Sequence, residues 1–193
     1  MPRKQIIHSF KIVVLGSYQC GKSSLIQKIE RNILAQINTG SAAPQKTKID
    51  LQFTEIDGNE RVQVLHRQLF KKARICIVIA DINNPNLFVN VQNWFKCAQE
   101  YAGKIPTVLV LSKTDQLQSE IEHELQKILK FCKFEGVFQS AINNGTGTDN
   151  IQDKIVQLIN QESCDVVKQI AGQGFEYAIV RDETPRKKKL GCL

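Results

Sequence analysis

A glycine-rich segment between an apolar run and a helix-like pattern constrains this chain more than any other feature. The apolar run is Phe10–Leu15, and the helix-like pattern extends from Gly21 to about Ile37. The segment that joins them follows the pattern G-x-x-x-x-G-K-S, which in this context is typical of a phosphate-binding loop, or P-loop. A chance glycine turn is the alternative. The loop consists of Gly16, Ser17, Tyr18, Gln19, Cys20, Gly21, Lys22, Ser23 and Ser24.

The residue types in this loop suit a bound phosphate. Gly16 and Gly21 allow the backbone to bend so that several N–H groups point at one anion. The helix that follows adds the positive end of its dipole. Lys22 would reach the β- and γ-phosphates of a nucleotide, and the Ser23 hydroxyl would ligand Mg²⁺. We therefore expect a nucleotide site, with Mg²⁺, after the first strand.

Apolar runs and helix-like segments alternate along the chain, as in an α/β fold. The sequence Asp57-Gly58-Asn59 is a hairpin-turn signal between two strand-like runs, Ile49–Ile56 and Arg61–Leu65. We therefore predict a mostly parallel sheet with one antiparallel edge strand, helices on both faces, and ligands at the carboxyl ends of the strands. Further strands are expected at Ile75–Ala80, Thr107–Leu111 and Gly136–Gln139, and further helices at Pro85–Ala102, Ile121–Phe131 and Asn150 to about Ala171.

Size, charge and cysteines restrict the class of protein. The 193 residues are 42% hydrophobic and 23% charged, which is ordinary for one soluble domain, and no apolar run suggests a membrane span or a secretory signal. Arg186–Lys189 supply four of the seven net positive charges, so we expect a basic tail and no nucleic-acid binding. The six cysteines form no C-x-x-C pair, which argues against zinc and disulfides and favours the cytoplasm.

A second motif, Ser112-Lys113-Thr114-Asp115, follows a predicted strand, and a later strand runs into Ser140-Ala141-Ile142. An aspartate accepts hydrogen bonds from both the ring N–H and the exocyclic amine of guanine, which adenine does not present together. With the P-loop, these motifs resemble those of small GTPases of the Ras superfamily, Asn/Thr-Lys-x-Asp and Ser-Ala-Lys. The resemblance implies that Lys113 lies along the base and that the Ala141 N–H contacts the guanine oxygen. A turn role for Asp115 and a solvated role for Lys113 are the alternatives.

Three segments resemble the Rab branch of this superfamily, within a likeness that covers about residues 8–160. Asn90–Phe95 is similar to the Rab helix pattern Asn-Val-x-x-Trp, Ala80–Asn84 to the strand end before it, and Thr39–Ala43 to the switch I sequence Thr-Ile-Gly-Ala-Ala. The resemblance implies a monomeric P-loop NTPase domain, the small GTPase G domain, that binds GTP or GDP with Mg²⁺. It also implies effector and regulator partners, and a role in vesicle traffic on the cytosolic face of an intracellular membrane.

The region that would switch departs from the family pattern. The family carries Asp-x-x-Gly-Gln after a strand, where the Asp holds Mg²⁺ through water and the Gln orients the attacking water. Here Val62–Leu65 runs into His66 with no Asp-x-x-Gly, and only Arg67–Arg74 precede the next strand. We therefore expect the helix of switch II to be missing and GTP hydrolysis to be slow. Gln68 is a weak catalytic candidate, and for both His66 and Gln68 a surface connection is the alternative.

Single residues carry three further expectations. Tyr18 stands where the family keeps a small residue, and its ring should obstruct a catalytic Gln and a partner's arginine finger unless it points to solvent. Thr39 is the candidate switch I ligand of Mg²⁺, with Ser41 and Thr47 as competitors. Ser112 replaces the Asn or Thr that braces the P-loop in the family.

The C-terminal end resembles a membrane-targeting tail. Arg186–Lys189 would attract the protein to an anionic membrane surface, with a binding free energy of ~1 kcal/mol per charge. Cys192 is the candidate for lipidation, which would supply a second membrane-anchoring signal. Cys192 is second from the end, so it fits neither a C-a-a-X box nor a two-cysteine Rab ending, and a plain solvated tail is the alternative. We divide the chain into a G domain, residues 1–171, and a variable tail, residues 172–193.

The leading hypothesis is a Rab-like GTP- and GDP-binding protein with slow or impaired hydrolysis. A non-cycling scaffold that holds its nucleotide structurally, a pseudo-GTPase, is the alternative, and it would not respond to Mg²⁺ chelation. A P-loop kinase fits less well, because it gives Ser112–Asp115 no role and the sequence has no arginine-rich lid segment.

Overall fold

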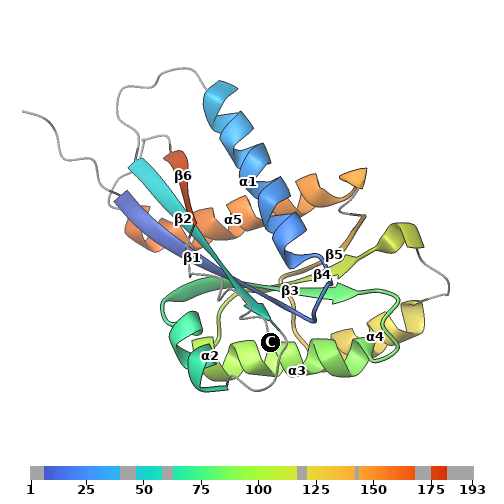
Figure 1. Ribbon diagram of the computed structural model, residues 1–193. Coiled ribbons are helices and arrows are strands. Elements are labelled where there is room, and N and C mark those ends of the chain that lie inside the picture. Colours follow the sequence, from blue (N-terminus) through green and yellow to red (C-terminus); the bar gives the residue numbers. More distant parts are fainter. Residues whose placement is uncertain are drawn as a thin grey trace, which may run out of the picture.

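The computed structural model describes residues 7–39, 47–57, 63–116, 121–141, 144–167 and 175–181. In this part of the chain, six parallel strands form one sheet in the order β5-β4-β3-β1-β2-β6 (Figure 1). The strands are β1 (Ile7–Gly16), β2 (Thr47–Asp57), β3 (Ala73–Asp81), β4 (Thr107–Ser112), β5 (Gly136–Ser140) and β6 (Phe175–Arg181). The helices are α1 (Lys22–Thr39), α2 (Gln63–Phe70), α3 (Leu87–Ala102), α4 (Glu122–Phe131) and α5 (Thr148–Val167), with a short 3₁₀ helix η2 (Thr114–Gln116).

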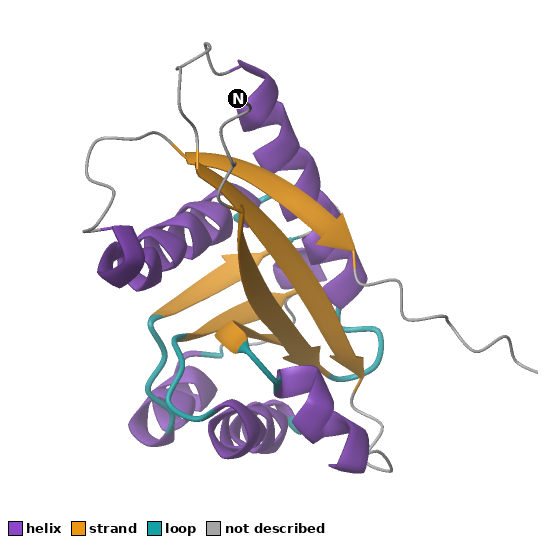
Figure 2. Ribbon diagram, turned by 90° about the vertical axis from the view of Figure 1, so that its left-hand side faces the viewer, coloured by secondary structure: helices purple, strands orange, loops and turns teal. Residues whose placement is uncertain are grey.

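Both faces of the sheet are covered by helices. In β1, Ile12 and Val14 belong to one core cluster, whereas Val13 and Leu15 belong to the other, and all four are fully buried. Successive residues of a strand point to opposite faces, so an unbroken apolar strand needs cover on both sides. Helices α1 and α5 cover the first face, and α2, α3 and α4 cover the second (Figures 1 and 2). The predicted α/β architecture is therefore confirmed.

The elements with a regular hydrophobic period lie where the sequence predicts them. Helix α3 buries Leu87, Val91 and Ala98, which share one face at helical spacing, and Trp94 packs beside them against the same cluster. The helix begins two residues after Pro85, which the sequence places in its first turn. Regular periodicity thus predicts this helix to within a few residues.

The predicted antiparallel edge strand is wrong. Strand β2 pairs with β1 in parallel register, from Ile7 opposite Lys48 to Gly16 opposite Asp57. The segment expected as a returning strand instead enters α2, so the expectation that this helix is missing is also wrong. The helix buries Phe70, which stacks on Tyr101 of α3 with ring centroids 5.7 Å apart. This aromatic contact gives the segment more buried apolar surface than an exposed edge strand would.

A sixth strand comes from the segment that the sequence assigns to the tail. Strand β6 pairs in parallel with the outer edge of β2, from Thr47 opposite Phe175 to Phe53 opposite Arg181. The boundary at residue 171 stays a prediction, but a strand on its C-terminal side was not foreseen. The basic run and Cys192 lie outside the described residues. None of the helices in the described ranges is both long enough and apolar enough to span a bilayer.

Candidate nucleotide-binding site

The predicted P-loop joins β1 to α1 at the carboxyl edge of the sheet, as expected. Gly16 lies so close to β3 that a Cβ atom on it would be 2.3 Å from the carbonyl oxygen of Ile79. Gln19 and Gly21 both have positive φ, at 58° and 99°, and turn the chain into the helix. A side chain at residue 16 would push the loop away from the sheet, so the first glycine of the motif is required by close packing.

Lys22 is held across the loop by backbone carbonyl groups. Its Nζ donates hydrogen bonds to the carbonyl oxygens of Gly16 at 3.1 Å and Ser17 at 2.8 Å, and the side chain is only 5% exposed. The loop thus carries a positive charge on its inner side at the amino end of α1. Such an end of a helix attracts anions through its dipole and its unpaired N–H groups.

Ser23 contacts an acidic residue that the sequence analysis missed. Its hydroxyl donates a hydrogen bond of 2.7 Å to Oε2 of Glu55, which lies opposite Val14 in the β1–β2 register. A hydroxyl and a carboxylate are oxygen ligands of the kind that Mg²⁺ prefers. The oxygen atoms of Ser23 and Glu55 therefore fit the expected ion, and these two residues would hold it. No larger cluster of metal-ligating residues occurs in the described ranges.

A signal for Glu55 was present in the sequence. The segment Glu55-Ile56-Asp57-Gly58-Asn59 reads acid-x-x-Gly-amide, one side-chain methylene longer at its first position and one shorter at its last than Asp-x-x-Gly-Gln. The same residues also form a hairpin-turn signal, which conceals this motif in the sequence. Gly58 and Asn59 lie outside the described residues.

The second motif is joined to the P-loop by Ser112. Its buried hydroxyl donates to the carbonyl oxygen of Cys20 at 2.7 Å, and the carbonyl oxygen of Ala80 lies at 3.2 Å. Nζ of Lys113 forms an ion pair of 2.6 Å with Asp81, at the end of β3. Asp115 lies exposed in η2. The smaller Ser112 side chain thus makes a direct bond to the loop, and the carboxylate of Asp115 is accessible to a ligand.

The third loop departs from the arrangement that the resemblance implies. The Ala141 N–H, expected to contact a guanine oxygen, donates instead to the carbonyl oxygen of Thr146 at 3.2 Å. The Ser140 hydroxyl donates to the same oxygen at 3.0 Å. Ile142 lies outside the described residues. In this conformation the loop is closed on itself, and the Ala141 N–H is not available to a base.

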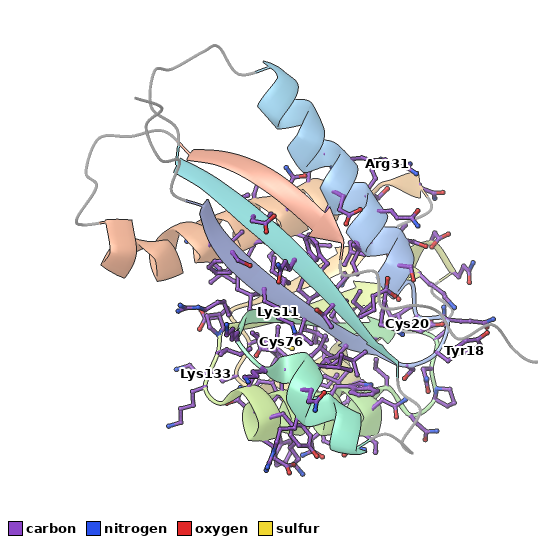
Figure 3. All side chains as sticks on the ribbon, turned by 60° about the vertical axis from the view of Figure 1, so that its left-hand side comes forward. Lys11, Tyr18, Cys20, Arg31, Cys76 and Lys133 are labelled. Carbon is purple, nitrogen blue, oxygen red and sulfur yellow. The ribbon has the colours of Figure 1, made fainter. Side chains whose placement is uncertain are left out.

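Tyr18 points away from the protein. Its side chain is 79% exposed and projects from the loop in Figure 3. The alternative in which the ring faces solvent is therefore the one observed.

Cys20 of the same loop is buried. Burial raises the pKa of its thiol, and nearby Lys22 offsets only part of this rise. Cys20 is thus a neutral packing residue at neutral pH.

Thr39 and Gln68 are not brought to the P-loop. Thr39 ends α1, which begins at Lys22, so at 1.5 Å per residue the two lie about 26 Å apart along the helix. Gln68 is exposed near the end of α2, where the chain enters the amino end of β3, opposite to the P-loop edge. The structure thus supports neither Thr39 as a Mg²⁺ ligand nor Gln68 as a catalytic residue; the surface alternative for Gln68 is observed.

Comparison with known proteins agrees with this geometry. The model of the Ras family matches residues 11–161. Ras-related protein Rab-32B of Dictyostelium discoideum is 27% identical, over 83% of this chain and 66% of the relative. Ras-related protein Rab-32 of Mus musculus is 27% identical over 81% of this chain and 78% of the relative. Rab-like protein 2A of Homo sapiens is 28% identical over 64% of this chain and 56% of the relative. The chain belongs to the Ras family and is Rab-like within it.

Proposed function

We propose that this protein binds GTP and GDP with Mg²⁺ and acts as a Rab-type protein in vesicle traffic. The observation that carries this proposal is the hydrogen bond from Ser112 to the Cys20 carbonyl, which joins the phosphate loop to the base motif. A phosphate loop alone is compatible with any nucleotide. A phosphate loop fixed to Ser112-Lys113-Thr114-Asp115 presents a phosphate site and a guanine-selective carboxylate as one unit.

Each part of the site has a role in this proposal. Backbone N–H groups of the P-loop and the ammonium of Lys22 hold the phosphates, and Asp115 accepts hydrogen bonds from the guanine edge. Ser23 ligands Mg²⁺, and Glu55 orients Ser23 and a water of the ion. Bound Mg²⁺ neutralises phosphate charge. Of the residues predicted to bind the nucleotide, the proposal rests on Gly16, Ser17, Tyr18, Gln19, Cys20, Gly21, Lys22, Ser23, Ser24, Ser112, Lys113 and Asp115, and it gives no role to Ser140, Ala141 and Ile142 in the closed conformation of their loop.

Hydrolysis in this proposal is slow. Asn59 aligns with the Gln that orients the attacking water, and its amide is one methylene shorter. Neither Gln68 nor another side chain identified above substitutes for it. The protein is therefore a binder that keeps its GTP for longer than an intact family member.

Membrane attachment completes the proposed role. Arg186–Lys189 provide weak attraction to anionic lipid, and a lipid on Cys192 provides stable anchoring on the cytosolic face. Effector and regulator proteins then meet the protein at that surface. The test is partitioning of protein expressed in cells, with and without Cys192→Ser. Equal membrane fractions for the two chains would exclude a lipid on Cys192.

A pseudo-GTPase scaffold is the second candidate, and the closed Ala141 loop favours it. A switch releases GDP when Mg²⁺ is chelated and changes conformation with GTP. A scaffold does neither. Release of a fluorescent GDP analogue after EDTA addition, followed by exchange into GTP, distinguishes the two functions.

The guanine assignment is tested by changing Asp115. We expect purified protein to carry GDP or GTP, identified by chromatography of the denatured extract. Asp115→Asn should lose GTP affinity and gain affinity for xanthosine triphosphate, because the amide presents a donor where the carboxylate accepted. Asp153→Asn, the same change at an exposed position of α5, is the control. Unchanged GTP affinity in the Asp115 variant would refute guanine recognition.

A further inference from the structure

Asp81 ends strand β3 beside the second motif, and it has no role in the function proposed above. It lies opposite Ser112 in the parallel register of β3 and β4, two strands that run side by side in Figure 1. The Ile82 N–H continues this pairing with a hydrogen bond of 3.1 Å to the carbonyl oxygen of Ser112. Asp81 is therefore fixed at the carboxyl edge of the sheet, next to the loop that carries Lys113 and Asp115.

Both oxygens of the Asp81 carboxylate have a partner. Oδ1 accepts a hydrogen bond of 3.0 Å from the Asn83 N–H, and Oδ2 pairs with Nζ of Lys113 at 2.6 Å. The side chains of Lys113 and Asp81 are 35% and 21% exposed, so solvent screens this pair less than it screens a fully exposed one. The first contact orients the carboxylate, and the second fixes the end of the lysine side chain.

The backbone of Lys113 is constrained as well. Its φ is 61°, in the left-handed region that a lysine seldom adopts. Its carbonyl oxygen accepts a hydrogen bond of 3.0 Å from the Gln116 N–H, which closes the turn that contains Asp115. Strained conformations of this kind cluster at ligand sites. The Lys113 side chain thus starts from a fixed backbone and ends at a fixed carboxylate.

We propose that Asp81 is a positioning residue of the guanine site. It holds the Lys113 ammonium so that the lysine stem lies along the base and the Asp115 carboxylate stays open to the guanine edge. Asp81 acts through Lys113 and does not itself touch the nucleotide. Because the base site belongs to the proposed function, this inference rests on that function and adds a residue to it.

The flexibility of lysine gives the first reason. A lysine side chain has a long flexible stem, and fixing it costs conformational entropy. In the ion pair with Asp81, this cost is incurred when the protein folds and not when the nucleotide binds. A stem that is already in place presents its apolar surface to the flat face of a purine. Such preorganisation raises affinity without a new contact.

The charges of the loop give the second reason. Lys113 and Asp115 are separated by one residue, and Asp115 is exposed. A lysine without another partner would be attracted to that carboxylate, and the contact would occupy the oxygens that the guanine N–H and amine require. The ion pair with Asp81 neutralises the ammonium instead. Asp115 therefore keeps its full negative charge as an acceptor.

The rate of GDP release from the native full chain and from Asp81→Asn tests this role. Asparagine keeps the size of the side chain and an oxygen for the Asn83 N–H, and it removes the charge. We expect release of a fluorescent GDP analogue in Mg²⁺ to be at least about fivefold faster in the variant. Glu124→Gln removes the acidic partner of the exposed Lys127 pair on α4, so it is the matched control and should leave the rate unchanged.

A double-mutant cycle separates positioning from a structural role. Lys113→Met alone should also release GDP faster, and in that background Asp81→Asn should change the rate by less than about twofold, because Asp81 acts through Lys113. Equal acceleration in both backgrounds would overturn the proposal, since Asp81 would then serve the fold alone. A rate for Asp81→Asn within about twofold of the native rate would also overturn it. A native chain that binds no guanine nucleotide would instead overturn the proposed function, and this inference with it.

Discussion

The loops that hold the phosphate and the base contrast with the β2–α2 segment that would respond to them. In the first region, Gly16 packs against β3, Lys22 is held by a loop carbonyl, and Ser112 is bonded to the loop. In the second, a glutamate replaces an aspartate, and the element that follows the parallel strand β2 among the described residues is a helix of eight residues. This contrast underlies our proposal that nucleotide binding is retained while the machinery of hydrolysis is altered.

The difference has a physical origin. The first region is built from backbone atoms and close packing, where one added atom collides with a neighbouring strand. The second region uses side chains such as Glu55, which is exposed and accepts one hydrogen bond from Ser23. An exposed side chain such as Glu55 can be one methylene longer without a clash. The group that its carboxylate contacts then lies at a shifted position.

The largest effect is expected from Gly147, beside the third loop. Gly147 and Gly103 have nearly the same φ, 78° and 79°, but a Cβ on Gly147 would lie 2.2 Å from the carbonyl oxygen of Gln139, whereas one on Gly103 would meet nothing within 4 Å. Gly147→Ala should lower the free energy of unfolding by about 2–4 kcal/mol, and Gly103→Ala by about 1 kcal/mol. Equal losses in urea titrations would show that close packing does not define this loop.

Lys22→Ala tests how much the positive charge of the P-loop contributes to nucleotide affinity. Removing the ammonium should weaken nucleotide binding by about 10- to 100-fold, since charge-assisted hydrogen bonds contribute about 1.5–3 kcal/mol each. Lys104→Ala, at an exposed loop position, is the matched control and should leave affinity unchanged. Titration with a fluorescent GDP analogue measures both, and a loss of less than threefold at Lys22 would contradict the assigned role.

Glu55→Gln tests the altered region. The amide keeps the size of the side chain and removes its charge, so the Mg²⁺-dependent part of GDP affinity should fall about tenfold while affinity in EDTA stays the same. Glu55→Asp, which carries the residue of the family motif, should stay within about threefold of the native chain. An equal loss with and without Mg²⁺ would mean that Glu55 serves only the fold.

The smallest effect concerns the pH dependence of the free energy of unfolding, to which Cys97 of α3 contributes. Burial raises the pKa of the Cys97 thiol from 9.0 to about 11. A raised pKa leaves stability unaffected below pH 9 and lowers it as pH rises toward 11, because only the unfolded chain then releases the proton. Between pH 8 and pH 10 the loss should be about 1 kcal/mol greater for the native chain than for Cys97→Ser. Identical pH profiles in urea unfolding would contradict this.

Sequence reasoning predicted the parts of the molecule that depend on local pattern. The P-loop and helix α3, which contains Trp94, are predicted by the spacing of residues that lie close together in the sequence. The β2–α2 connection was misjudged because Asp57-Gly58-Asn59 is a strong hairpin signal, whereas the burial of Phe70 against Tyr101 depends on a distant helix. Strand β6 was missed for the same reason, since a parallel pair joins segments far apart in sequence and leaves no turn signature.

The central claim, that binding is retained and hydrolysis is slow, is tested most directly by a single-turnover assay. Protein loaded with GTP in Mg²⁺ is followed over time, and the GTP and GDP that stay bound are quantified after quenching. We predict tight retention with decay at least about tenfold slower than the 10⁻⁴ s⁻¹ that is typical of intact family members without a partner. Decay of bound GTP at about 10⁻⁴ s⁻¹ or faster would contradict the account.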